Sequence, residues 1–217
     1  MAMSTATAAP PVARAVRALA PAVFIDKDGT LAHDVPYNVD PDRLRLRSDA
    51  GPALAHLQRA GYRLVLITNQ AGIAHGLFGE EALPPLWAAI AAALAPHGAV
   101  LDAIYYCPHH PEGTRPAYAR ACDCRKPAPG LLLRAASEHG LDLARSWFIG
   151  DILDDVEAGH RAGCRCVLLD VGSETEWRDA PLRRPDRVAA SLTEAVADIL
   201  AAADRGEARN PAAAWTR

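Results

Sequence analysis

The sequence predicts an α/β fold, a three-layer Rossmann-like domain in which helices cover both faces of a parallel sheet. Short apolar runs of strand length alternate along the chain with longer segments of helical periodicity, an order typical of parallel strands joined by helices. The chain has 217 residues, half of them apolar, which is enough for one domain with a complete core. Several apolar runs end in polar residues, and the ends of such strands are where open α/β sheets bind ligands.

The first half of the chain is expected to contain three strands and two helices. A buried strand at 22–25 is followed by a mixed polar loop at 31–48. Apolar residues at helical spacing predict a helix over 51–60 that Gly61 ends, and an alanine-rich helix over 80–95 contains a proline pair near its start. The other two strands are expected at 63–67 and 101–106.

The second half is expected to contain three helices, two strands and a long loop. A helix over 129–139 is ended by Gly140, and a helix over 154–160 has an acidic first turn that suits the helix dipole. A polar loop is expected over 170–187, before a last alanine-rich helix over 191–203. The two strands are expected at 146–149 and 165–169.

Both ends of the chain are expected to lie outside the folded domain, which we place at 21–205. Residues 1–20 are rich in alanine and proline and are expected to form a disordered tail, and residues 206–217 are expected to fray. The net charge is −3, with acids and bases interspersed, which gives no support to a nucleic-acid or membrane partner. No apolar run approaches the roughly 18 residues of a membrane span, and no secretion signal is recognisable. We therefore expect a cytoplasmic protein, and a monomer.

Two carboxylates, two positions apart, follow the first strand in the stretch Asp26-Lys27-Asp28-Gly29-Thr30. Alternate residues of a strand share a face, so Asp26 and Asp28 are expected to converge. Converging carboxylates repel each other unless a cation lies between them, and a hard cation with oxygen ligands is most simply Mg²⁺. An ordinary Asp-Gly turn is the alternative, because that pair is common in turns.

Polar side chains that suit an anion follow the second strand. Thr68, Asn69 and Gln70 offer hydroxyl and amide groups, and a glycine-containing turn follows them, an arrangement that favours oxyanion recognition. The loop after the first strand contains Asp34 and Tyr37 and is expected to pass over the same edge of the sheet. These residues are candidates for substrate contact, with a plain surface connection as the alternative.

Cysteine and histidine residues form two close groups that border the segment 107–124. Their members are Cys107, His109, Cys122 and Cys124. Thiolate and imidazole are preferred ligands of Zn²⁺, and four of them complete a tetrahedral structural site. The segment between them is rich in proline and poor in apolar residues, so we expect a metal to hold it. His110 is an alternative to His109, and a redox pair or free thiols are the alternative to a metal site.

Two cations, Arg125 and Lys126, directly follow the second cysteine group. The planar fork of arginine and the point charge of lysine both suit a phosphate group. A solvated basic pair is the alternative.

Because of the motifs at these strand ends, the chain resembles the haloacid dehalogenase (HAD) superfamily of phosphohydrolases over residues 20–172. The matching motifs are Asp26-Lys27-Asp28-Gly29-Thr30, Thr68-Asn69, Lys126-Pro127, and Gly150-Asp151 with Asp155 four residues later. The cysteine-histidine groups and the stretch that starts at Thr68 are similar to the D-glycero-D-manno-heptose 1,7-bisphosphate 7-phosphatase branch. Histidinol-phosphate phosphatases belong to the same zinc-loop group and are the close alternative.

The resemblance implies a capless HAD-like phosphatase, in which the zinc loop replaces a cap domain and leaves the site open to a small phosphorylated metabolite. Asp26 would be the nucleophile that forms an aspartyl-phosphate. Asp28 would protonate the leaving group and then activate water. Thr68 and Lys126 would bind the phosphoryl oxygens during transfer.

The resemblance also implies two metal ions and a set of substrate contacts. Catalytic Mg²⁺ would be held by Asp26, the main-chain carbonyl of Asp28, and Asp151. Asp155 would support Lys126 or the metal shell. Structural Zn²⁺ would be held by Cys107, His109, Cys122 and Cys124. Substrate contacts would come from Asp34, Tyr37, Asn69, Gln70, Arg125 and Lys126.

Three features depart from the heptose phosphatase pattern. Ile152 stands where a lysine is common, Ala71 stands where a serine is usual, and the segment 172–177 is unlike its counterpart. Loss of the lysine removes a cation from the pocket, so another phosphomonoester is an alternative substrate. A silent zinc-held binding module, which would release no phosphate, is the alternative from another class.

Overall fold

The computed structural model of the protein describes residues 18–207. The disorder expected of residues 1–17 and the fraying expected of residues 208–217 therefore lie outside the described residues. Ala20, which the sequence assigned to the tail, already takes part in the fold, because its N–H donates to the carbonyl of Gly140 at 3.1 Å.

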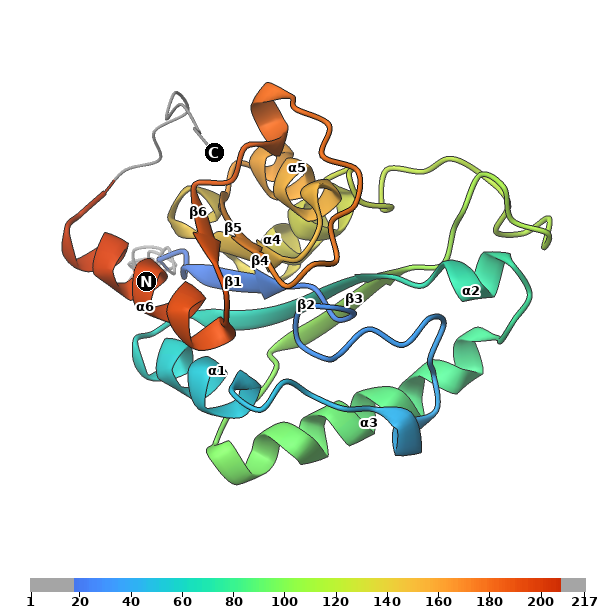
Figure 1. The fold of residues 1–217 in the computed structure, drawn as a ribbon, viewed down its shortest axis with the longest axis horizontal. Helices are drawn as coiled ribbons and strands as arrows, with labels where there is room; N and C mark the ends of the chain where they lie inside the picture. Colours follow the sequence, from blue (N-terminus) through green and yellow to red (C-terminus); the bar gives the residue numbers. More distant parts are fainter. Residues whose placement is uncertain (1–17, 208–217) are drawn as a thin grey trace, which may run out of the picture.

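The sheet has six strands, all parallel, which confirms the predicted α/β class (Figure 1). The strand order is β3-β2-β1-β4-β5-β6, so the order reverses between β1 and β4. The strands are β1 (Ala22–Ile25), β2 (Arg63–Asn69), β3 (Ala103–Cys107), β4 (Trp147–Gly150), β5 (Arg165–Leu169) and β6 (Arg187–Ala189).

Helices cover both faces of the sheet, with α1, α3 and α6 on one side and α4 and α5 on the other (Figure 1). They are α1 (Ala50–Arg59), α2 (Ala71–Ala74), α3 (Leu83–Leu94), α4 (Gly130–His139), α5 (Leu153–Ala162) and α6 (Leu192–Asp204). Five 3₁₀ turns lie at Pro41–Arg43, Glu80–Ala82, Ala95–His97, Leu143–Arg145 and Pro181–Arg183. Within residues 18–207, none of the helices has the length and apolar character that a bilayer span requires.

The central strand β1 is buried on both of its faces. Val23 and Ile25 pack into the core beneath α1, α3 and α6, whereas Ala22 and Phe24 pack into the core beneath α4 and α5. This is why the strand reads as a continuous apolar run rather than an alternating one. Its carboxyl end is therefore held rigidly between two cores.

The structure corrects the expected elements in three places. A sixth strand, β6, begins where a loop was expected to end, and its three residues are too few to give a recognisable period. The helix expected over 80–95 is α3 with a 3₁₀ turn at each end. Strand β2 continues to Asn69, and the short helix α2 follows it.

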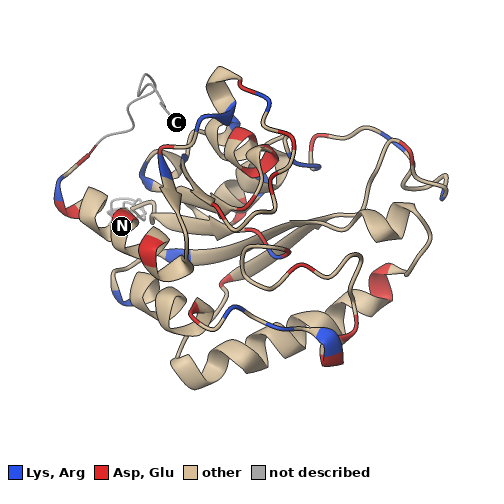
Figure 2. Cartoon of the chain, viewed as in Figure 1, with Lys and Arg blue, Asp and Glu red and all other residues tan. Residues whose placement is uncertain are grey.

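The segment between β5 and β6, residues 170–186, lies along α5 (Figure 1). Arg183 Nη2 lies 2.5 Å from Asp154 Oδ1. Near the other end of α5, His160 Nε2 lies 2.8 Å from Asp186 Oδ2. Arg183 of the segment thus pairs with two acidic residues of α5, Asp154 and Glu157, and Figure 2 shows acidic positions on α5 and basic positions on the segment beside it. We call residues 170–186 the β5–β6 segment.

Candidate active site

The carboxyl ends of β1 and β4 meet where the strand order reverses, which is the usual ligand position in an open α/β sheet. Asp26 directly follows β1, its N–H donates to the carbonyl of Ile149 at 3.0 Å, and its side chain is buried. The Asp28 carboxylate lies 2.5 Å from the ammonium group of Lys27 and is 32% exposed. The two predicted carboxylates therefore have different surroundings, one inside the site and one at its rim.

Lys126 places a positive charge inside the site. Its Nζ lies 2.5 Å from Asp26 Oδ1 and 2.7 Å from Asp155 Oδ1, and the side chain is 3% exposed. Burial alone would lower the pKa of Lys126, but the carboxylates of Asp155 and Asp26 outweigh it and hold that pKa above its ordinary value. Lys126 is therefore a fixed ammonium group that links the carboxyl end of β1 to the first turn of α5.

Asp151 follows β4 and packs against the turn after β1. Thr30 Oγ1 donates to Asp151 Oδ1 at 3.0 Å. Gly29 has a φ of +81°, and a Cβ at this position would lie 1.8 Å from Asp151 Oδ2. A side chain at position 29 would therefore displace Asp151, so glycine is required both for the turn and for the close approach.

The buried carboxylates outnumber the cations around them. Oxygen atoms of Asp26, Asp151 and Asp155 lie within 4.8 Å of one another, with Lys126 as their neighbouring ammonium group. Burial, followed by the charge of Asp26, raises the pKa of Asp151 to about 6. Burial also raises the pKa of Asp155 to about 8. A divalent cation with oxygen ligands would neutralise this excess charge, so the residues present fit Mg²⁺. We call these three aspartates and Lys126 the carboxylate centre.

The carboxylate centre differs from the predicted magnesium set at one residue. The side chain of Asp155 belongs to the group, and the side chain of Asp28 does not. The predicted contribution of Asp28 is its main-chain carbonyl, which stays a prediction. Burial raises the pKa of Asp28 to about 6, a value that suits a group which both gives and takes a proton.

The side chains at the end of β2 are already engaged with their neighbours. Asn69 accepts from the N–H of Lys126 at 3.1 Å and donates to the carbonyl of Lys126 at 3.3 Å. Gln70 is buried and donates to Thr68 Oγ1 at 3.0 Å. Asn69 thus fixes the main chain of Lys126, and Gln70 orients the hydroxyl of Thr68. Their predicted contacts with substrate stay predictions.

Aromatic and basic groups gather on the loops that follow β1, β2 and β3. Tyr37 is 55% exposed, and its ring centroid lies 6.1 Å from that of His75, which in turn lies 4.8 Å from that of His110. Arg125 Nη1 is buried without a hydrogen-bond partner among the described residues. After burial, the charges of Arg125 and His75 lower the pKa of His110, so these groups lie close together. Asp34 is exposed on the same loop as Tyr37.

Sequence reasoning missed His75 and treated His110 only as a possible zinc ligand. His75 directly follows α2, and its position after a strand-end turn was the one available signal. We call Tyr37, His75, His110 and Arg125 the basic rim.

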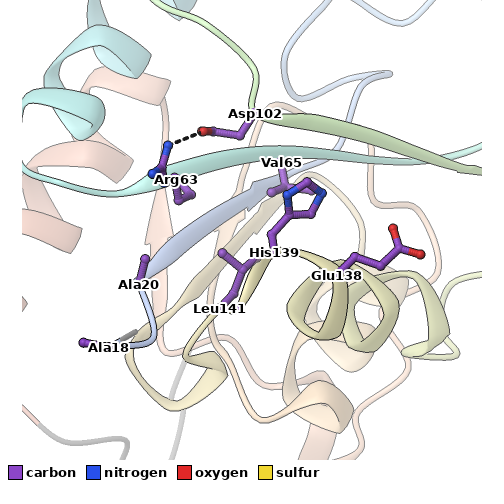
Figure 3. Close-up of a pocket in the computed structure, with 9 residues that line it drawn as sticks. Ala18, Ala20, Arg63, Val65, Asp102, Glu138, His139 and Leu141 are labelled. Carbon is purple, nitrogen blue, oxygen red and sulfur yellow. Dashed lines mark hydrogen bonds and ion pairs between the residues drawn. The ribbon is translucent and has the colours of Figure 1, made fainter. Parts of the chain in front are cut away.

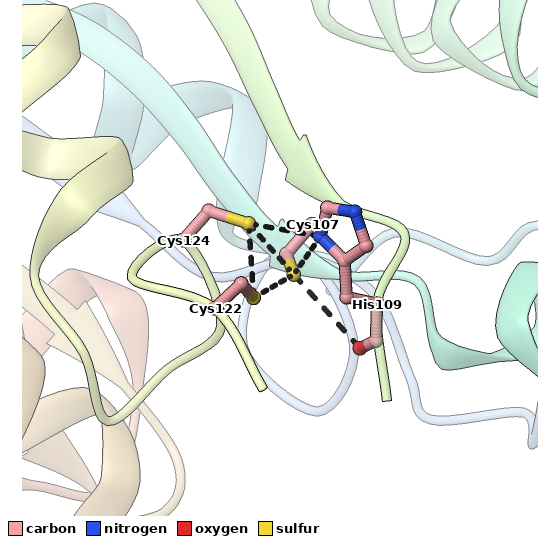
Figure 4. Close-up of side chains that lie close together, drawn as sticks. All are labelled: Cys107, His109, Cys122 and Cys124. Atoms are coloured by element: carbon pink, nitrogen blue, oxygen red, sulfur yellow. Dashed lines mark hydrogen bonds between the residues drawn. The ribbon is translucent and has the colours of Figure 1, made fainter. Parts of the chain in front are cut away.

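The predicted cysteine-histidine residues come together beyond the end of β3 (Figure 4). The sulfur atoms of Cys107, Cys122 and Cys124 lie 3.1–3.5 Å apart, and His109 Nδ1 lies 3.3 Å from Cys124 Sγ. A tetrahedral Zn²⁺ with bonds of about 2.3 Å needs sulfur atoms separated by about 3.8 Å. Burial raises the pKa of the Cys107 thiol, so its thiolate needs a cation beside it. The donor set therefore fits Zn²⁺, and His110 lies outside it, with its Nδ1 accepting from the N–H of Glu112.

A tyrosine-glutamate network fixes the loop 107–124, which carries the cysteine-histidine cluster, to the body of the protein. Glu80 accepts from the hydroxyls of Tyr106 and Tyr118. These two hydrogen bonds lower the pKa of Glu80. The network links the 3₁₀ turn before α3 to the strand that enters the loop and to the loop itself.

A hollow at the opposite edge of the sheet, where the strands begin, contains none of these groups (Figure 3). This cavity of about 310 Å³ is lined by residues near the starts of β1, β2 and β3 and at the end of α4. Its ion pair, between Arg63 and Asp102 at 2.7 Å, is half exposed on the arginine side. Among the described residues, the buried aspartates Asp26, Asp151 and Asp155 all lie at the carboxyl edge of the sheet, and we place the active site there.

Known proteins have similar sequences. The HAD-hydrolase-like family model matches residues 123–195. The D-glycero-β-D-manno-heptose-1,7-bisphosphate 7-phosphatase of Photorhabdus laumondii is 46% identical over 138 residues, which cover 64% of this chain and 73% of that protein. The enzyme of the same name from Escherichia coli K12 is 41% identical over 149 residues, covering 69% and 78%.

Solved structures agree with the sequence comparison. A structure from Mesorhizobium loti, described as a HAD-like phosphatase, has a TM-score of 0.75 and 34% identity, covering 92% of this chain and 93% of that one. The D,D-heptose 1,7-bisphosphate phosphatase from B. bronchiseptica, complexed with magnesium and phosphate, has a TM-score of 0.69 and 32% identity, covering 83% and 98%. The fold and the carboxylate centre define a HAD-like phosphatase, a hydrolase of phosphoric monoesters. Within that class, the chain belongs to the family of the D-glycero-D-manno-heptose 1,7-bisphosphate 7-phosphatases.

Proposed function

We propose that this protein is a Mg²⁺-dependent phosphatase that removes the 7-phosphate of D-glycero-β-D-manno-heptose 1,7-bisphosphate. The observation that carries the proposal is the carboxylate centre, in which Asp26 lies against a fixed Lys126 and close to Asp151. The substrate comes from the relatives, which are named for it at 41–46% identity.

In the proposed reaction, Asp26 attacks the phosphorus atom and forms an aspartyl-phosphate, while the sugar leaves as an alcohol. Asp28, with a pKa of about 6, donates the proton that the leaving oxygen needs and takes one from the water that hydrolyses the intermediate. Lys126 and the Thr68 hydroxyl are oriented before substrate arrives. They would stabilise the phosphoryl oxygens without further rearrangement.

The metal ions would be held by the two clusters. Asp26, Asp151 and the main-chain carbonyl of Asp28 would bind Mg²⁺, which when bound neutralises charge so that a dianionic phosphate approaches a carboxylate. Asp155 would act through its ion pair with Lys126. The structural Zn²⁺ would be held by Cys107, His109, Cys122 and Cys124.

The basic rim supports a substrate that has a second anionic group. Arg125 directly precedes Lys126, so a sugar whose reacting phosphate lies at Lys126 would extend past the guanidinium. The unpaired Nη1 of Arg125 and the neighbouring imidazoles of His75 and His110 offer donors to a remote phosphate. This arrangement offsets the cation that is lost because Ile152 replaces lysine.

The test is phosphate release from the α and β anomers of heptose 1,7-bisphosphate and from histidinol phosphate, with Mg²⁺ and with EDTA. We expect the β anomer to give the highest kcat/KM, by about tenfold or more, and activity to disappear in EDTA and return with Mg²⁺. A higher kcat/KM on histidinol phosphate would change the substrate but keep the reaction class. Absence of Mg²⁺-dependent release from every ester would overturn the proposal.

A further inference from the structure

Two members of the carboxylate centre lie at the start of α5, where Asp155 accepts from the N–H of Ile152 at 3.3 Å but the N-cap side chain itself makes no capping hydrogen bond. Asp151 directly precedes the N-cap position and Asp155 lies in the first turn. The N-cap residue is Ile152, whose side chain has no hydrogen-bond acceptor. The first N–H groups of a helix have no partners within the helix, and they need acceptors from elsewhere.

The missing acceptor comes from the β5–β6 segment. Glu174 Oε2 accepts from the N–H of Leu153, the first residue of α5, at 2.6 Å. The other carboxylate oxygen of Glu174 accepts from the N–H of Glu176 at 2.6 Å, which fixes the side chain in a tight turn. The adjacent Ser173 lies near enough to the side chain of Asp151 to oppose the rise of its pKa. Glu174 therefore contacts the helix start, next to the carboxylate of Asp151.

The segment that carries Glu174 is fastened to α5 at two further points. Arg183 pairs with Asp154 at 2.5 Å, one residue before Asp155. Farther along the helix, both ring nitrogens of His160 face acceptors on the segment, the carbonyl of Leu182 at 2.9 Å and the carboxylate of Asp186 at 2.8 Å. The part of the segment that follows Glu174 is thus anchored to α5 by contacts outside the active site.

Two departures from the expected pattern therefore lie at one helix end, because Ile152 is the N-cap of α5 and Glu174 contacts the next residue, Leu153. Ile152 cannot cap the helix, and the unusual segment after β5 supplies a carboxylate at the same helix end. We infer that Glu174 is a positioning residue that fixes the first turn of α5 and so sets the places of Asp151 and Asp155 for Mg²⁺. This inference rests on the proposed function of the carboxylate centre.

The expected consequence is a change in metal affinity rather than in the chemical step. Without the acceptor, the first turn of α5 frays more readily, and Asp151 loses its fixed orientation. Partners that orient metal ligands typically change metal affinity by about 10- to 100-fold. Glu174 contacts no group that reacts, so kcat at saturating Mg²⁺ should change little.

The experiment compares Glu174→Ala with the matched control Glu176→Ala, which removes an exposed carboxylate from the same segment. Mg²⁺ binding is measured by calorimetry without substrate, and phosphate release is measured as a function of Mg²⁺ concentration. We expect Glu174→Ala to weaken Mg²⁺ binding about tenfold with kcat at saturating Mg²⁺ within about twofold, and Glu176→Ala to match wild type.

A second-site variant tests the compensation directly. Serine at position 152 has a side-chain acceptor suited to an N-cap, and the backbone there is already extended, at φ −127° and ψ 159°. Ile152→Ser combined with Glu174→Ala should recover most of the lost Mg²⁺ affinity. If Glu174→Ala gives no soluble protein, Glu174→Gln, which retains one acceptor oxygen, should show a smaller loss in the same direction.

The outcomes separate this inference from the proposed function. Mg²⁺ affinity of Glu174→Ala, or of Glu174→Gln where only that variant is soluble, within twofold of wild type would overturn the inference. A double variant no better than Glu174→Ala would do the same, as would an equal loss in Glu176→Ala. Each of these results leaves wild-type phosphatase activity intact. Wild-type protein without Mg²⁺-dependent phosphate release would instead overturn the proposed function.

Discussion

Two clusters of metal-ligand side chains lie beyond the same edge of the sheet, and they are assembled in different ways. The carboxylate centre joins residues more than 100 positions apart and contains its own cation, Lys126. The cysteine-histidine cluster comes from a stretch of 18 residues, 107–124, with the charge of Arg120 near the outer nitrogen of His109. The sheet holds the first cluster in place, whereas the second must hold its own loop. Loss of the first should therefore remove activity, and loss of the second should remove stability.

The largest expected effect is that of Asp26→Asn on activity. The substitution keeps the shape of the side chain but removes the nucleophilic oxygen anion, so kcat should fall by about 10⁴-fold or more. The melting temperature should stay close to wild type, because the strand that carries residue 26 is fixed by two cores. Steady-state phosphate release and calorimetry measure the two quantities. Residual activity within tenfold of wild type would exclude Asp26 as the nucleophile.

The next largest effect is expected for Lys126→Met, which removes the internal cation of the carboxylate centre. Activity should fall by about 10²- to 10³-fold, because a preorganised donor to the phosphoryl group is lost. The metal-free protein should lose about 3–5 kcal/mol of stability, because Asp26 and Asp155 are left buried without their partner. Magnesium affinity should not decrease, since the removed charge repels the ion.

Arg63→Met is the matched control for this variant, measured by urea unfolding and by Mg²⁺ calorimetry. Arg63 also pairs with an aspartate, Asp102, but at the amino edge of the sheet, and the arginine is half exposed. Its loss should change stability by less than about 1 kcal/mol and leave activity unchanged. Equal destabilisation of the two variants would contradict the difference in environment that the structure assigns to them.

A third prediction concerns the cysteine-histidine cluster. Cys122→Ser removes one of four soft donors, so zinc stoichiometry should fall well below one per chain and the melting temperature should drop by several degrees. His110→Ala is the control, because His110 lies outside the cluster, and it should retain full zinc content. Metal analysis and scanning calorimetry measure both. If Cys122→Ser has unchanged zinc content and an unchanged melting temperature, the cluster is not a zinc site that stabilises the protein.

The difference between the clusters also explains how completely the ligands of each could be predicted from the sequence. The cysteine-histidine donors are close in the chain, so their spacing alone brought the four together as a prediction, and only the choice between His109 and His110 needed coordinates. To predict that the residues of the carboxylate centre lie together, one must also know the strand order. The sequence placed Asp26 and Asp151 at strand ends, but only the pairing of β1 with β4 makes those ends neighbours.

What the sequence did not reveal are contacts between loops. Asn69 and Gln70 were predicted to contact the substrate, and the structure shows in addition that they bond to Lys126 and Thr68, which the sequence did not predict. Glu174 lies in a segment without any periodic pattern, and its partner Leu153 is 21 residues away. Such pairings depend on how two irregular segments cross, and no local propensity encodes that. The longer regular elements were predicted because periodicity marks them, whereas the three-residue strand β6 and the four-residue helix α2 were not.

The smallest expected effect is the pH dependence of stabilisation by magnesium. Burial and the charge of Asp26 raise the pKa of Asp151 from 3.8 to about 6. A raised pKa means that the folded state binds the proton more tightly than the unfolded state does. The stabilisation from this proton is therefore complete below the unfolded pKa and is lost as pH rises through about 6.

Magnesium replaces this proton, so its effect should depend on pH. We expect Mg²⁺ to raise the melting temperature by a few degrees more at about pH 7.5 than at about pH 5, measured by scanning calorimetry against EDTA. Asp151→Asn does not titrate and should remove most of this difference. An equal Mg²⁺ effect at the two pH values would mean that the ion does not compete with this proton. In that case, the excess charge of the carboxylate centre is not what the ion neutralises.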